Sequence, residues 1–131
     1  MAFPVDEKYI KEAENRLGVT LPRELRTRLG RQNGGEWDDG LQIWFLHPVL
    51  DSSDKKRVAR SCNDICRETA TARQWRGFPE NAVCIAHNDS GDLLLLLPAE
   101  DDEGRLARGI YHWNHETAVV SLWANNCGVF K

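Results

Sequence analysis

The chain has 131 residues, a formal net charge of −3, and 41% hydrophobic and 28% charged residues. This length and composition favour a single soluble globular domain over residues 1–131, because chains of about 100 to 150 residues usually form one core. They exclude a membrane-spanning protein, since the longest aliphatic run, Leu93 to Leu97, is far shorter than the roughly 20 apolar residues of a membrane helix. The first residues also lack the basic and apolar regions of a secretory signal, so we expect a cytoplasmic protein.

The first predicted element is a helix that begins after Asp6, a residue type that caps helix N-termini, and ends at Gly18. Its apolar residues recur at helical spacing: Tyr9, Ile10, Ala13 and Leu17. A second, short helix is predicted over residues 22–32. Pro22 suits its first position, where the missing N–H is no loss.

The second helix is predicted to end in a tight turn at Asn33-Gly34-Gly35. This run suits a left-handed exit, because most other residues would lose about 1 to 2 kcal/mol there. We expect Leu25 and Leu29 to face inward at positions i and i+4, with the arginines outward. Glu24 is placed to pair with Arg28 one turn later.

The sequence then predicts a loop from Asn33 to Gly40 and a strand from Leu41 to His47, which ends at Pro48. The polar stretch from Asp51 to Arg60 carries no clear element. A third helix is predicted from Ser61 to Trp75, and its residues available for burial are Ile65, Ala72 and Trp75.

Two β-hairpins follow, separated by Pro98 and an acidic loop from Glu100 to Gly104. Their strands are predicted over Ala82 to His87, Asp92 to Leu97, Gly109 to Asn114, and Ala118 to Trp123. The turns are predicted at Asn88 to Gly91 and at His115 to Thr117, with Tyr111 and Trp113 on one strand face. Helices followed by antiparallel strands predict an α+β fold, with N-terminal helices packed on one face of a mainly antiparallel, meander-like β-sheet.

Several motifs occur in a fixed order over nearly the whole chain. They are Leu17-Gly18 with Leu21-Pro22, Asn33-Gly34-Gly35, Ile85-Ala86 leading through Asn88 to Gly91-Asp92, and Tyr111-His112-Trp113-Asn114-His115-Glu116. In this order they resemble the SUKH superfamily, the Smi/Knr-like domain. Members often finish with a C-terminal helix. Here the segment that would form it, Ala124 to Lys131, is short and is interrupted by Gly128.

The resemblance implies a binding domain rather than an enzyme, with no cofactor. Bacterial domains of this type commonly act as immunity proteins, which bind a polymorphic or contact-dependent toxin, often a nuclease, and neutralise it. Other members are similar to intracellular scaffolding and regulatory domains. Our leading hypothesis is therefore an immunity protein that blocks a cognate toxin by stoichiometric occlusion, and the alternative is a scaffold of the same fold.

A metal-dependent hydrolase that uses the histidines is a third, less favoured hypothesis. In a strand His112 and His115 would point to opposite faces, and no Cys-x-x-Cys pair is present, so we expect no metal site. The spacing of the four cysteines matches no secreted disulfide framework, so we expect reduced thiols: Cys62, Cys66, Cys84 and Cys127. Cys62 and Cys66 are predicted to be core residues on one helix face.

Other chemistries have weaker support. There is no Gly-x-Ser-x-Gly motif, and Asp89 and Asp92, which flank a turn, are expected to cap their own backbone rather than form an acid/base pair. The Asn-Gly-Gly run follows a helix and lacks the lysine of a phosphate loop. Two basic clusters would suit nucleic-acid phosphates if they shared one face: Arg23, Arg26, Arg28 and Arg31, and Lys55, Lys56, Arg57 and Arg60. The acidic total favours solvated helix faces instead, so we expect no direct contact with nucleic acid.

Two acidic segments suit a basic protein partner such as a nuclease toxin. The residues predicted to bind it are Glu36, Trp37, Asp38, Asp39, Glu100, Asp101, Asp102 and Glu103. Complementary charge speeds association more than it tightens the final complex. Reversal of Asp101, Asp102 and Glu103 to Lys is therefore expected to slow association.

Overall fold

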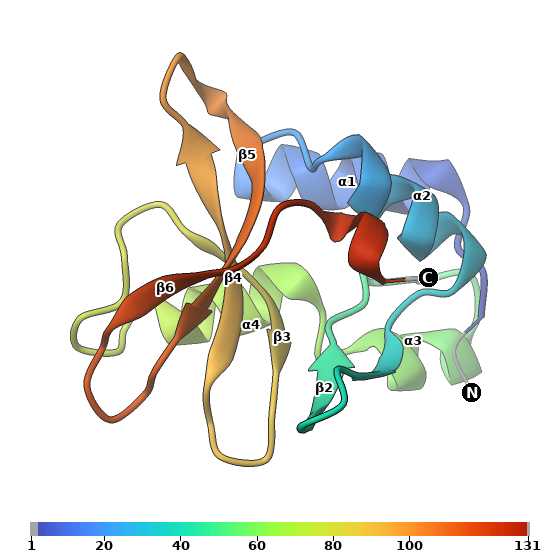
Figure 1. The fold of residues 1–131 in the computed structure, drawn as a ribbon. Helices are drawn as coiled ribbons and strands as arrows, with labels where there is room; N and C mark the ends of the chain where they lie inside the picture. The colour runs from blue at the N-terminus through green and yellow to red at the C-terminus, as the bar shows by residue number, and fades with distance from the viewer. Residues whose placement is uncertain (1–2, 131) are drawn as a thin grey trace.

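The computed structural model describes residues 3–130, which form a six-stranded antiparallel sheet with helices packed against it (Figure 1). The helices are α1 (Glu7–Leu17), α2 (Arg23–Arg31), α3 (Lys55–Ser61), α4 (Ile65–Ala72) and the 3₁₀ helix η1 (Cys127–Val129). The strands are β1 (Gly35–Asp38), β2 (Ile43–Leu46), β3 (Val83–His87), β4 (Leu93–Ala99), β5 (Asp102–Trp113) and β6 (Val120–Ala124). Their order in the sheet follows the chain, β1-β2-β3-β4-β5-β6, so the predicted α+β meander is confirmed.

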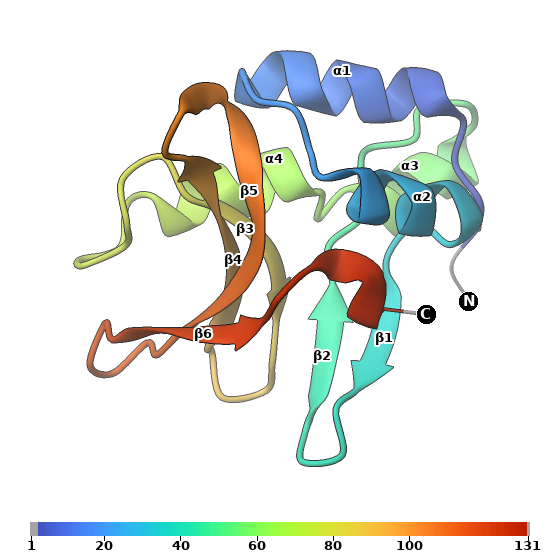
Figure 2. The ribbon, with the colours of Figure 1, turned by 45° about the horizontal axis from the view of Figure 1, so that its top comes forward.

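Both faces of the sheet are covered. On what we call the inner face, Trp44, Leu94 and Ile110 share a core with Ile10 of α1 and Leu25 of α2. The outer face carries a second core, in which α4 contributes Ala72 against side chains of the strands: Cys84, Leu93, Leu95 and Trp113. The aliphatic run of β4 is therefore buried from both sides, as Figure 2 shows with α4 behind the sheet.

Helix α1 has the predicted boundaries. The Asp6 carboxylate accepts a hydrogen bond from the Lys8 N–H, and Gly18 closes the helix at φ 75° with its N–H on the Glu14 carbonyl. Pro22 lies one residue before α2, at the N-cap, rather than at the first helical position that the sequence predicts. The helix is still entered at the φ of −58° that the proline ring imposes.

The Asn-Gly-Gly run makes a left-handed turn that leads directly into β1. Gly34 and Gly35 have φ values of 97° and 91°, whereas Asn33 is not in the left-handed region. The Asn33 side chain acts differently, because its amide donates to the Val49 carbonyl and accepts from the Val49 N–H, each at 2.8 Å. This residue therefore ties the end of the helical layer to the segment that follows β2.

Arg28 is buried, so the prediction that all arginines of α2 face outward is wrong. Its guanidinium donates one hydrogen bond to the Gln32 carbonyl and another to the Gly34 carbonyl, the latter at 2.9 Å. Both acceptors belong to the turn that follows α2. The predicted Glu24–Arg28 pair is absent for the same reason, and Glu24 pairs with Arg108 of β5 instead.

Several element boundaries also differ from the prediction. Residues 35–38 form a strand rather than a loop, since they pair with all four residues of β2. The polar stretch from Asp51 to Arg60 contains α3, and the predicted third helix is divided between α3 and α4, so that Trp75 lies beyond α4 with 43% exposure. Pro98 does not close β4, because the strand passes it with a register shift and β5 begins at Asp102.

The four cysteines are free thiols, as predicted, but the placement of two was wrong. Cys62 ends α3 and is exposed, whereas Cys66 belongs to α4 and is half-buried, so they do not share a helix face. The two buried cysteines are instead Cys84 and Cys127. Burial raises the pKa of the Cys127 thiol to about 12. At the C-terminus, residues 127–129 form one 3₁₀ turn that packs Phe130 into the core; Met1, Ala2 and Lys131 lie outside the described residues.

We expect Gly34→Ala to lower the free energy of unfolding by about 1 to 2 kcal/mol, because a Cβ in the left-handed region is strained. The added Cβ would also lie 3.2 Å from the Leu46 carbonyl oxygen. Gly30→Ala is the matched control: a Cβ there meets nothing within 4 Å, and the change should stabilise the helix by about 0.5 to 1 kcal/mol. Urea unfolding of both variants checks the opposite signs; equal effects would contradict the assignment.

Candidate functional site

The eight residues predicted to bind a partner lie at two opposite ends of the sheet. In an antiparallel meander successive connections alternate between the ends. The β1–β2, β3–β4 and β5–β6 connections therefore share one end, which we call the turn end (residues 39–42, 88–92 and 114–119), while the β4–β5 turn lies at the other (Figure 2). Glu36 to Asp39 approach the turn end and Glu100 to Glu103 form the opposite one, so one compact surface does not contain both.

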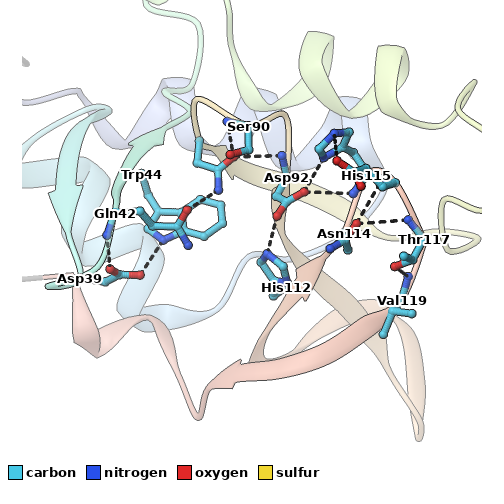
Figure 3. Close-up of polar contacts among 12 residues, drawn as sticks. Asp39, Gln42, Trp44, Ser90, Asp92, His112, Asn114, His115, Thr117 and Val119 are labelled. Atoms are coloured by element: carbon cyan, nitrogen blue, oxygen red, sulfur yellow. Dashed lines mark hydrogen bonds and ion pairs between the residues drawn. The ribbon is translucent and has the colours of Figure 1, made fainter.

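Asp39 organises the β1–β2 hairpin and is not free for a partner. One carboxylate oxygen accepts the N–H groups of Leu41 and Gln42, and the other accepts the indole N–H of Trp44 at 2.9 Å. Figure 3 shows the contacts with Gln42 and Trp44. Burial would raise the pKa of Asp39, but these hydrogen bonds outweigh it and hold the pKa below its usual value. The carboxylate is thus a structural anion that fixes the hairpin tip.

Asn88 connects this hairpin to the β3–β4 turn. Its side-chain amide donates to the Gln42 side-chain oxygen at 2.5 Å, and its own oxygen accepts the N–H groups of Ser90 and Asp92 (Figure 3). The side chain is buried. Asn88 therefore supplies the turn cap that the sequence assigned to the aspartates.

Asp92 connects the β3–β4 turn to the β5–β6 hairpin. One carboxylate oxygen accepts from the His115 backbone N–H and lies 2.6 Å from His115 Nδ1, while the other lies 2.9 Å from His112 Nε2. The prediction that the two histidines point apart is wrong, because His115 lies in the turn, after β5 has ended, and its side chain folds back onto Asp92. Burial would raise the pKa of Asp92, but hydrogen bonds from His115 and His112 keep it below its usual value.

The apolar residues of the β1–β2 hairpin are exposed beside this network. Leu41 is 94% exposed at the tip and Ile43 is 42% exposed at the start of β2. Glu36 and Asp38 flank them on β1, and both are exposed. The hairpin thus presents an apolar tip with carboxylates along one side.

Trp37 is not the exposed contact that its acidic neighbours suggested. It is half-buried, and its ring meets Phe130 edge-on at 6.0 Å between centroids. Its indole N–H is buried without a hydrogen-bond partner among the described residues. Trp37 therefore supports β1 from the inner face.

At the opposite end of the sheet the acidic residues are exposed and partly paired. The Asp101 carboxylate accepts from Arg105 at 2.8 Å, and Asp102 accepts the Gly104 N–H at 2.9 Å. Asp102 and Glu103 belong to β5 rather than to a loop. No exposed large apolar side chain of the described residues lies between 100 and 118.

The histidines do not form a metal site within residues 3–130, where no group of three or more His, Cys, Asp or Glu side chains is arranged to hold an ion. Burial lowers the pKa of His47 to about 4, so its ring is neutral at pH 7. Its Nδ1 lies 3.2 Å from the Cys84 carbonyl, which only accepts, and its Nε2 lies 2.8 Å from His87 Nδ1. His47 Nδ1–H therefore donates, His47 Nε2 accepts from His87, and both nitrogens are occupied.

The two basic clusters are partly neutralised by carboxylates. Arg26 pairs with Glu7 and Glu14, and Arg57 pairs with Asp51 at 3.3 Å. The guanidinium groups of Arg57 and Arg60 also lie over the Phe3 ring, beside a cavity of about 610 Å³ between α3 and the start of β1. Together with the buried Arg28, these contacts weaken the case for a phosphate-binding surface.

The family model described as the SMI1 / KNR4 family (SUKH-1) matches residues 4–130. The chain belongs to the SMI1 / KNR4 family (SUKH-1). No curated protein and no solved structure matches it. Membership supports a domain of the immunity-protein type, which associates with protein partners.

Two motifs of this SUKH-1 domain lie at or beside the turn end. Gly91 has a φ of 93°, which completes the turn that aims Asp92 at the histidines. On the outer face Trp113 donates its indole N–H to the Gly77 carbonyl at 3.3 Å and stacks on Trp75. Gly91, Asp92 and Trp113 therefore support the chain at the turn end. Among residues 3–130 no helix is long and apolar enough to cross a membrane.

Sequence reasoning missed the residues that connect the three turns: Gln42, Asn88, Asp92, His112 and His115. Their only signal is that Asn88, Asp92 and the two histidines lie inside family motifs, next to predicted turns. A turn residue is expected to bond its own backbone. Here Asp92 instead reaches residues 20 and 23 positions away, which no local pattern encodes.

We expect Asp92→Ala to lower the free energy of unfolding by about 1 to 3 kcal/mol at pH 7, because two histidine side chains and a backbone N–H lose their acceptor. The folded-state pKa of Asp92 is depressed, so its stabilisation is present above the unfolded pKa of about 3.9 and is lost as the pH falls through the folded pKa. Denaturant unfolding at pH 7 and at about pH 2 should show the difference from wild type shrinking in acid. Asp89→Ala, at an exposed position of the same turn, should stay within about 0.5 kcal/mol of wild type at both pH values.

Proposed function

We propose that this SUKH-1 domain is an immunity protein that binds a cognate toxin domain and blocks its active site or substrate groove. The observation that carries the proposal is the β1–β2 hairpin, whose exposed apolar tip and acidic flank stand on the hydrogen-bonded turn end. No catalytic step or cofactor is part of this function. Of the four predicted residues of this segment, Glu36 and Asp38 are proposed to contact the toxin. Trp37 and Asp39 are proposed to hold the hairpin in place for that contact.

The composition of the hairpin fits the centre of a protein interface. Protein interfaces bury an apolar centre inside a polar rim, and a few central side chains supply most of the affinity. Leu41 and Ile43 supply such a centre, and Glu36 and Asp38 supply one side of the rim. Leu41 at 94% exposure makes almost no contact within the chain, so its burial would be gained on binding.

The turn network prepares this surface before the partner arrives. Asp39 holds the tip, and the Gln42–Asn88 hydrogen bond fixes the hairpin to the central strands. A segment that is already ordered loses little conformational entropy on binding, so more of the contact energy appears as affinity. This favours a hairpin that enters a preformed groove of a toxin.

The charge of the hairpin suits a basic nuclease. Carboxylates beside the contact attract a cationic surface during the encounter and raise the association rate, most strongly at low salt. The second acidic segment, Glu100 to Glu103, lies at the opposite end of the sheet and pairs in part with Arg105. An interface of standard size covers about 800 Å² per partner, so contact at the hairpin leaves this second segment for long-range attraction at most.

The proposal expects a toxin domain to be encoded by the reading frame immediately upstream of this gene, and the test uses that protein. We expect co-expression of this protein to restore growth of cells that produce the toxin, and the purified proteins to form a stoichiometric complex. A protein that neither binds its neighbour nor protects cells would contradict the immunity function. Stable binding to a different protein without protection would support the scaffold alternative, and stoichiometric zinc in the purified protein would support the hydrolase.

We expect the double variant Glu36→Lys and Asp38→Asn to slow association with the toxin by about tenfold at low salt, and to weaken its salt dependence. The change of Asp38 to Asn keeps the side-chain oxygen that accepts the Gly40 N–H. Stopped-flow or surface-plasmon measurements over a range of salt concentrations give the rates.

The charge-matched control is Glu103→Lys with Asp102→Asn, which makes the same change in net charge at the other end of the sheet. It should alter the rate much less. Equal losses in both variants would show that net charge alone attracts the partner, and a loss confined to the control would move the contact to the β4–β5 end.

A further inference from the structure

The edge strand β6 presents a second surface, distinct from the hairpin. It is the last strand of the sheet, and its outer side pairs with no other described strand. Residues 117–124, Thr-Ala-Val-Val-Ser-Leu-Trp-Ala, contain no charged residue and no proline. Three apolar side chains of this segment are exposed: Val119 (58%), Val120 (37%) and Leu122 (59%).

Residues 119–122 of this edge lack the features that usually prevent strands from pairing between molecules, and the one register shift of β6 lies beyond them, between Leu122 and Ala124. Natural sheets protect exposed edges with charged side chains, prolines, strong bulges or a covering segment. By contrast, the outer edge strand β1 at the other side of the sheet carries two carboxylates in four residues, Glu36 and Asp38. An uncharged, apolar and unpaired edge is therefore specific to β6.

The pairing of β6 with β5 determines which backbone groups face outward. The Asn114 N–H donates to the Val119 carbonyl, and the register continues with Trp113 opposite Val120, His112 opposite Ser121 and Tyr111 opposite Leu122. Because hydrogen-bonded and non-hydrogen-bonded pairs alternate in an antiparallel ladder, Val119 and Ser121 direct their backbone groups toward β5. The N–H and carbonyl groups of Val120 and Leu122 consequently point away from the sheet.

We propose that β6 pairs antiparallel with β6 of a second copy of this chain, about a twofold axis at Ser121, so that the two sheets become continuous. With this axis, Val120 of one copy lies opposite Leu122 of the other, and the reverse pair is equivalent. Both residues have outward backbone groups, so each pair exchanges two N–H···O hydrogen bonds. Between these two pairs, Ser121 of one copy lies directly opposite Ser121 of the other, as a non-hydrogen-bonded pair.

The strand is suited to its own copy because the pairing is self-complementary. The Val120 and Leu122 side chains share the outer face, where they lie opposite Trp113 and Tyr111 of β5, so the twofold brings two apolar cross-strand pairs together. No like charges meet, since the segment has none. A basic toxin would gain no charge complementarity from this edge, whereas the acidic hairpin provides it.

The size of the contact predicts a reversible dimer. One five-residue strand per copy is small beside the roughly 800 Å² per partner of a stable interface, so we expect monomers and dimers to exchange with concentration. The proposal does not rest on the immunity function, because β1 and β6 form opposite edges of the sheet.

Disulfide trapping tests the register. Ser121→Cys is made in a Cys62→Ser background, which removes the exposed native thiol. Non-hydrogen-bonded antiparallel pairs place their Cα atoms about 4.5 Å apart, within the range that a disulfide spans, so we expect rapid covalent dimers under mild oxidation. Val119→Cys in the same background is the matched control. Val119 lies two residues from the axis at Ser121, so the two introduced cysteines of a dimer would be about four strand positions apart, too far for a disulfide. Cross-linking of the control as fast as Ser121→Cys would overturn the proposal.

Molar mass measured by light scattering tests the native protein. From about 10 µM to about 1 mM, we expect the mass of the wild type to rise toward twice that of the monomer. Leu122→Lys should remain monomeric, because it places a cation in each apolar pair, and its 59% exposure allows the monomer to fold. Leu41→Lys makes the same substitution on the hairpin, at a side chain that is 94% exposed, and should dimerise like the wild type. A wild type that stays monomeric at about 1 mM, or a dimer that only Leu41→Lys abolishes, would overturn the proposal.

Discussion

The left-handed turn at Gly34 and Gly35 is the constraint on which the proposed binding surface depends. It connects α2 to β1, and four side-chain hydrogen bonds hold it: Arg28 donates to the Gln32 and Gly34 carbonyls, and the Asn33 amide bonds both the carbonyl and the N–H of Val49. The turn therefore fixes the helical layer to the first hairpin at its root. The turn thus sets where β1 begins and how the hairpin leaves the helical layer.

The far end of the same hairpin is fixed by a chain of side-chain hydrogen bonds. Asp39, Asn88 and Asp92 each take more than one hydrogen bond, and together with Gln42 and two histidines they join the three connections of the turn end. Half-buried carboxylates with depressed pKa values are often read as catalytic groups. Here their lone pairs are taken up by backbone N–H groups and rings of the same chain, which gives them a structural role. The exposed side chains around them are the ones we propose for partner contact.

The two edges of the sheet have opposite character, and this separates two kinds of contact. Strand β1 carries carboxylates beside an apolar tip, whereas β6 is uncharged and has outward backbone groups at Val120 and Leu122. Charge suits recognition of a different, basic protein, and neutrality suits pairing between identical strands. A dimer through β6 would present two hairpins at the outer limits of one continuous sheet.

The sequence by itself determined the elements whose signals are local. Asp6 and Gly18 bound α1, the glycines of Asn-Gly-Gly require left-handed backbone, and short turns between apolar runs define two hairpins, from which the α+β meander and the family follow. Only the tertiary structure decided contacts between distant residues. The burial of Arg28, the pairing of residues 35–38 as β1, the convergence of His112 and His115 on Asp92, and the separation of the two acidic segments all depend on strand order and register. Those are set by long-range packing, which leaves no periodicity along the chain.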